Sequence, residues 1–78
     1  MSEIVPLGQA RINQLLRVVR VEASQQEVVH RLQDLNIRRG SQIRIYQRYP
    51  NAPLMLAVGD ARVAIDSELS KTIFVSHQ

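Results

Sequence analysis

The amino-acid sequence predicts a mainly β domain, a small barrel of five strands with one α-helix after the first strand. Three observations support this fold class. Short runs of alternating apolar and polar residues fill most of the second half of the chain. A segment near the middle instead has apolar residues at helical spacing. The length of 78 residues suits one hydrophobic core but not two well-filled sheets. We therefore expect a single domain over residues 1–78.

The first strand is expected between two turn signals, Pro6 with Gly8 on one side and the polar residues 23–26 on the other. Residues 12–21 include many β-branched side chains, a composition typical of strands. Two arginines interrupt this apolar run. The pattern therefore favours a long strand that is bent or bulged.

The helix is expected to begin at Ser24, because Ser24 followed three residues later by Glu27 has the spacing of a capping box. Its apolar positions recur at helical spacing and define the face that packs on the barrel. They are Val28, Leu32 and Leu35, with Val29 beside them. Placed there, the helix would cover one open side or edge of the barrel.

The helix is expected to stop near Leu35. Asn36 tolerates the left-handed backbone conformation that ends many helices, and Ile37 can fold back on the last apolar turn. Residues 38–41 then form a turn into the next strand.

The segment after this turn alternates, with Ile43 and Ile45 on one side and polar residues on the other, and predicts a half-buried strand. The residues on the other side are Gln42, Arg44, Tyr46 and Arg48. The two prolines of the 50–53 loop make it rigid and reverse the chain. Two further alternating runs, joined by the tight turn at 59–60, predict a β-hairpin.

Residues 66–69 contain capping residues but have room for only one helical turn before the final strand at 72–75. Five short strands in so small a chain are best accommodated by a curled antiparallel sheet. The sequence thus predicts an SH3-like barrel, with a short helical turn before its last strand.

The amino-acid composition excludes several classes of protein function. The chain has no cysteine, which excludes disulfides and thiolate chemistry and fits a reducing cytoplasm. No apolar stretch approaches the roughly 18 residues that a membrane span needs. We expect a cytoplasmic protein without direct membrane insertion. Nine of the ten basic residues are arginine and the net charge is +3, which suits contacts with carboxylates or phosphates.

No set of residues in the sequence predicts catalysis, and we expect no enzyme and no cofactor. The one candidate metal motif is Glu27-x-x-His30, with Asp34 one turn further along the helix. Iron sites of this kind draw ligands from several helices, so solvated side chains are the favoured interpretation. His77 is expected to lie in a fraying terminus.

Tyr46 stands between Arg44 and Arg48 on a predicted strand, an arrangement by which small barrels bind single-stranded nucleic acid. Aromatic residues are scarce in the chain, however, so an ordinary exposed strand face is favoured. The three glycines stand alone, and no glycine-rich phosphate loop is present.

The order of these pieces resembles the FeoA family, small cytoplasmic proteins that accompany the bacterial ferrous iron transporter FeoB. The central resemblance runs from Arg31 to Ser41, a leucine-bearing helix followed by a turn that ends in Gly-Ser. The pieces that follow in the family's order are residues 43–45, 50–53, 56–59, 63–65 and 73–75. Asn36 stands where the family usually has glycine, a mild departure because Asn also tolerates this backbone geometry.

The resemblance implies an accessory protein that docks on the cytoplasmic part of FeoB and supports iron uptake without binding iron tightly. If docking uses the helix and the turn after it, the candidate residues are Val29, Leu32, Arg38 and Arg39. Their alternative roles are core packing and solvation, and for Leu32 core packing is favoured.

Two other functions remain open. One is a nucleic-acid-binding small barrel, whose affinity would fall steeply with salt. The other is a regulatory module related to the barrel at the end of some metal-dependent repressors. An uncovered sheet edge also allows weak self-association.

Overall fold

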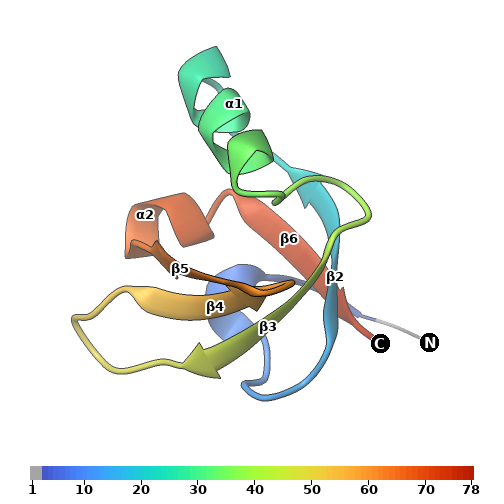
Figure 1. Cartoon of the computed structure of the whole chain (residues 1–78), viewed down its shortest axis with the longest axis vertical. Coiled ribbons are helices and arrows are strands. Elements are labelled where there is room, and N and C mark those ends of the chain that lie inside the picture. The colour runs from blue at the N-terminus through green and yellow to red at the C-terminus, as the bar shows by residue number, and fades with distance from the viewer. Residues whose placement is uncertain (1–2) are drawn as a thin grey trace.

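The structure is a computed structural model that describes residues 3–78. Its strands form one antiparallel sheet in the order β1-β6-β2-β3-β4-β5, which curls around a shared core (Figure 1). The elements are β1 (Ile4–Pro6), the 3-10 turn η1 (Leu7–Gln9), β2 (Leu16–Val21), α1 (Gln26–Asp34), β3 (Gln42–Gln47), β4 (Leu54–Val58), β5 (Ala61–Ile65), α2 (Ser67–Ser70) and β6 (Ile73–His77). The expected small, mainly β barrel is confirmed.

The expectation of five strands was one short. β1 pairs with β6, with Val5 opposite Val75 and Pro6 opposite Phe74. A segment of three residues is too short to show alternation, and its partner lies at the far end of the chain. Pro6 fits this position because β1 is an edge strand, where a missing N–H costs no ladder hydrogen bond.

The first predicted strand is shorter than expected, because β2 begins only at Leu16. Ile12 and Leu15 instead lie in the loop before it and are 41% and 40% exposed. The predicted irregularity is confirmed by a register shift between Val18 and Arg20 in the pairing with β6.

The core lies inside the curled sheet and takes alternate residues from the long strands. Its fully or almost fully buried apolar members are Leu7, Ala10, Leu16, Val18, Leu32, Ile37, Ile43, Ile45, Leu54, Leu56, Val58, Val63, Ile65, Ile73 and Val75. The alternation predicted for β3 is confirmed, with Ile43 and Ile45 inside and Gln42 and Arg44 outside.

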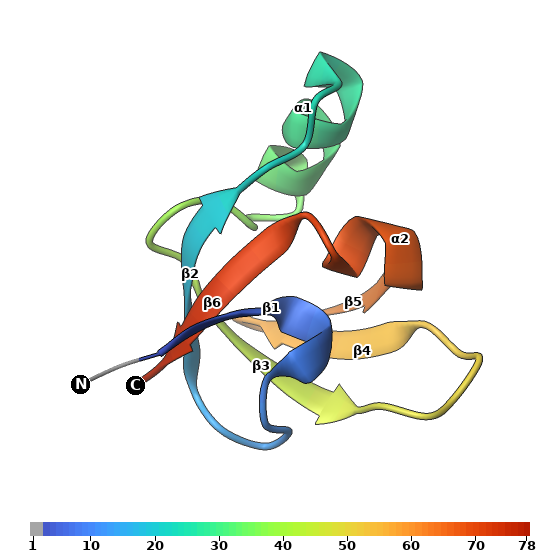
Figure 2. The same ribbon diagram turned by 180° about the vertical axis from the view of Figure 1, so that it is seen from behind.

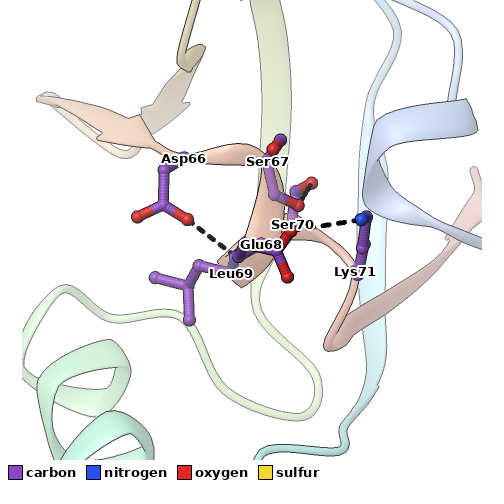
Figure 3. Close-up of polar contacts among 6 residues, drawn as sticks. All are labelled: Asp66, Ser67, Glu68, Leu69, Ser70 and Lys71. Carbon is purple, nitrogen blue, oxygen red and sulfur yellow. Dashed lines mark hydrogen bonds and ion pairs between the residues drawn. The ribbon is translucent and has the colours of Figure 1, made fainter.

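The predicted β4–β5 hairpin is confirmed, with Leu56 opposite Val63. Its tight turn depends on Gly59, which has a φ of 59°, a conformation that costs glycine little. The prediction of one helical turn before the last strand is also confirmed. Asp66 caps α2 by accepting a hydrogen bond of 2.7 Å from the Leu69 N–H, and Lys71 pairs with Glu68 (Figure 3).

The predicted capping box of α1 was wrong. The N-cap residue is Gln25, and no side chain caps the helix. The carbonyl of Gln25 accepts hydrogen bonds from the N–H groups of Val28 and Val29, so the helix begins one residue later than the box requires. This shift removes Ser24 and Glu27 from the positions at which they could cap each other.

Helix α1 also does not lie along a sheet edge. It projects from the end of the barrel beyond β2, as both views show (Figures 1 and 2). Leu32 is its one buried residue, and Val28 and Leu35 pack against the core. The edge strands are β1 and β5.

The expected fraying near His77 was wrong as well. His77 belongs to β6, where it pairs with Leu16, and its Nε2 accepts a hydrogen bond of 3.2 Å from the Arg11 N–H. The central position of β6 between β1 and β2 keeps this end of the chain ordered.

Candidate partner-binding groove

The C-terminal end of α1 directs the following turn across the end of the barrel. Asn36 takes the left-handed conformation, with a φ of 63°, as predicted. The N–H of Ile37 donates to the carbonyl of Leu32 at 2.8 Å, and the N–H of Asn36 donates to that of Gln33 at 2.9 Å. These two bonds form a Schellman motif, in which the apolar residue after the cap packs on the last helical turn.

The turn that follows is held by backbone hydrogen bonds on both sides. Ser41 closes it, since its N–H donates to the Arg38 carbonyl and its Oγ accepts from the Arg38 N–H. The N–H of Gly40 donates to the carbonyl of Val18 in β2 at 2.8 Å. Gly40 has a φ of 92°, which a side chain would strain. Arg38 and Arg39 therefore extend from an anchored loop.

A groove of about 270 Å³ lies between α1, the end of β2 and this turn. We call it the α1 groove. Its lining residues are Arg20, Val21, Val29, Leu32, Gln33, Ile37, Arg38 and Arg39. They include all four candidate docking residues, Val29, Leu32, Arg38 and Arg39.

These four residues differ in accessibility. Val29 is half-buried, and Arg38 and Arg39 are exposed, so a partner can reach all three. Leu32 is 0% exposed and belongs to the core, which is the role favoured for it from the sequence. Val29 is apolar but is not part of the core cluster, so it forms an apolar wall open to solvent.

The rim of the α1 groove is cationic. Arg20 lies over the Phe74 ring, 4.4 Å from its centroid, and forms an ion pair with Glu22. Within residues 3–78, neither Arg38 nor Arg39 takes part in an ion pair. Exposed guanidinium groups beside an apolar wall suit a partner segment that carries an apolar side chain next to carboxylates.

Four lining residues of the groove were not expected there from the sequence, namely Arg20, Val21, Gln33 and Ile37. For Ile37, the sequence did give a local signal, because an apolar residue after a helix-ending Asn is expected to fold back on the last helical turn. Arg20 and Val21 belong to the strand before α1. Their place beside the turn depends on how β2 crosses the barrel end, which no local pattern indicates.

The candidate metal motif on α1 and the candidate stacking platform around Tyr46 do not form binding sites in the described part of the chain. Glu27, His30 and Asp34 are exposed on α1, and residues 3–78 contain no group of three His, Asp or Glu side chains placed to hold a metal ion. Tyr46 is half-buried with the Arg62 guanidinium over its ring, at 5.4 Å. None of the helices within the described residues has the length and apolar character to cross a bilayer.

A curled antiparallel sheet with one projecting helix defines a small SH3-like domain. The sequence profile of the FeoA domain matches residues 5–77, so the chain belongs to the FeoA domain family.

Solved structures share this fold. A crystal structure of an iron uptake regulatory protein (FeoA) superposes with a TM-score of 0.88 and 22% identity, covering 97% of this chain and 100% of that one. The solution structure of iron(II) transport protein A from Clostridium thermocellum gives 0.84 and 20%, over 94% of this chain and 45% of that one.

A manganese-dependent transcriptional repressor gives a TM-score of 0.87 and 18% identity, over 100% of this chain and 44% of the repressor. At these identities the likeness establishes the fold. A sequence comparison with curated proteins found no match.

Proposed function

We propose that this chain is a cytoplasmic accessory protein of ferrous iron transport, which docks on the cytoplasmic part of a FeoB-type transporter through the α1 groove. Membership of the FeoA domain family supports the link to iron transport. Two proteins with this fold are named for iron uptake regulation and for iron(II) transport. In this proposal the chain acts by binding the transporter and catalyses no reaction.

The observation that carries the proposal is the chemistry of the α1 groove. Val29 presents an apolar wall on a helix that stands away from the barrel, and Arg38 and Arg39 border it without ion-pair partners in the described part of the chain. A partner that supplies carboxylates would find both guanidinium groups available. Arginine is well suited to this task, because its planar fork matches a carboxylate.

The test is capture of the chain by the purified cytoplasmic domain of the transporter. Arg38→Glu and Arg39→Glu are each expected to weaken capture by about tenfold or more, because each replaces attraction with repulsion at the rim. The control is Arg31→Glu, which makes the same charge change on an exposed α1 residue outside the groove. It should be captured like the unmodified chain.

Thermal unfolding of all three variants must match that of the unmodified chain, because exposed substitutions usually alter stability by less than about 0.5 kcal/mol. Equal capture of Arg38→Glu and Arg31→Glu would contradict docking at the groove. No capture of the unmodified chain would contradict the choice of partner.

The repressor likeness supports a second candidate function, a regulatory module acting beside a DNA-binding protein. The nucleic-acid-binding alternative has less support, because Arg62 lies over Tyr46 and Arg48 donates hydrogen bonds to the carbonyls of Gly8 and Ala10. Two of the three residues of the suspected stacking platform thus have other contacts.

A further inference from the structure

A second charged surface lies on the outer side of the sheet, formed by Arg17, Arg44 and Arg62. We call it the arginine face. Arg17 pairs with Gln42, Arg44 pairs with Ala57, and Ala57 pairs with Arg62. Paired residues of neighbouring strands project on the same side of a sheet, and all three arginines are exposed. The strands β2, β3 and β5 therefore carry these three arginines on the outer side of the curled sheet.

A hollow of about 370 Å³ opens within this face. Arg44 and Arg62 border it, and the small residues Ala57 and Gly59 leave it unfilled. Arg44 and Arg62 are two strands apart, which separates their backbones by about 10 Å. Two arginine side chains at that spacing can both reach one phosphate group placed between them.

Within residues 3–78, no carboxylate forms an ion pair with the arginine face. The ion pairs within residues 3–78 are Arg20 with Glu22 and Lys71 with Glu68, and neither involves this face. Arg17 donates to the side-chain amide oxygen of Gln78 at 3.3 Å, and Arg62 donates to the Ala61 carbonyl at 3.1 Å. Both acceptors are uncharged, so the positive charges remain available to an anion.

An exposed apolar side chain adjoins these charges. Leu15, 40% exposed, lines the same hollow as Arg44 and Arg62. It belongs to the loop before β2, which also exposes Ile12 and is tied to β3 by a bond of 2.7 Å from the Asn13 N–H to the Ile45 carbonyl. Basic residues near an anionic lipid surface are attracted to it, and an apolar side chain beside them can bury its surface among the headgroups.

We propose that the arginine face binds the phosphate headgroups of an anionic lipid bilayer, with Leu15 entering the headgroup layer. A nucleic acid fits this face less well, because its bases need open aromatic rings and Tyr46 lies beneath Arg62. Leu15 would also have no apolar partner on a phosphate backbone. The loop that carries Leu15 and helix α1 lie at opposite ends of the molecule (Figure 1). The α1 groove stays accessible while the face rests on lipid.

The test is co-sedimentation of the chain with vesicles of phosphatidylcholine alone and of phosphatidylcholine mixed with phosphatidylglycerol. Binding is expected with the mixed vesicles only and should decrease as salt is raised. The double variant Arg44→Gln/Arg62→Gln should lose about fivefold in affinity for each arginine, as expected for a basic residue at an anionic surface. Leu15→Ser should weaken binding further.

The matched control is Arg31→Gln/Lys71→Gln, which removes the same net charge from exposed positions in α1 and just after α2. It should retain most of the binding. Equal loss in the two double variants would show attraction by net charge alone and overturn the proposal. Absence of vesicle binding would also overturn it, whether or not the chain binds a single-stranded oligonucleotide. Arg38→Glu tests the α1 groove and should still bind vesicles, so the two proposals can fail separately.

Discussion

The backbone N–H of Ile37 donates a 2.8 Å hydrogen bond to the carbonyl of Leu32, and both side chains are completely buried. This pair joins the end of α1 to the barrel core at the point where the chain turns toward Arg38 and Arg39. The direction of the groove rim therefore depends on core packing. Four predictions test this and related features of the fold.

Leu32→Ala is expected to lower the free energy of unfolding by about 2–5 kcal/mol, because it opens a cavity in the core. Val29→Ala should change it by less than about 1 kcal/mol, since Val29 is half-buried and alanine favours the helix. Urea unfolding measures both changes. A loss below about 1 kcal/mol for Leu32→Ala would contradict its place in the core.

Asn36→Ala should lower the free energy of unfolding by about 1 kcal/mol, because alanine is strained in the left-handed conformation that Asn36 adopts. Asn36→Gly is the matched control and should be neutral or slightly stabilising. If the two variants unfold at the same urea concentration, the helix does not end in the way described.

Arg48→Gln should lower the free energy of unfolding by about 1–2 kcal/mol, because it removes the hydrogen bonds to the carbonyls of Gly8 and Ala10. Amide hydrogen exchange should then accelerate in residues 10–13. Arg44→Gln, in the preceding strand β3, should leave both measurements unchanged. Identical behaviour of these variants would indicate that Arg48 has no structural role.

Asp66→Ala should cost about 0.5–2 kcal/mol, because it removes the cap of α2. Lys71→Ala breaks only the exposed ion pair with Glu68 and should change stability by less than about 0.5 kcal/mol. Thermal unfolding compares the two. A larger effect from Lys71→Ala than from Asp66→Ala would contradict this assignment.

Much of the fold could be predicted because its signals are local. Asn36 with Ile37 indicated the end of α1, and Gly59 indicated the hairpin turn. The capping box failed although its spacing was correct, because the chain stays extended through Gln25. A helix start depends on where the preceding strand delivers the chain as well as on the residues at its first turn.

The candidate site was predictable in part for the same reason. Val29, Arg38 and Arg39 lie close together in the sequence, and the structure places them beside one groove. Arg20 and Val21 reach it from the preceding strand, so residue spacing alone did not connect them with the turn. The sequence favoured core packing for Leu32, which is fully buried, but it did not reveal that Val29, one turn earlier, remains accessible.

The sequence by itself determined the class of fold, the positions of most strands and turns, and a family resemblance that the profile match confirms. Only the tertiary structure decided that β1 joins β6, that His77 is held in a strand, and that three arginines from β2, β3 and β5 share one face. Turns and alternation arise from neighbouring residues. Strand order and shared surfaces arise from hydrogen bonds between segments far apart in the chain, and no local pattern encodes those.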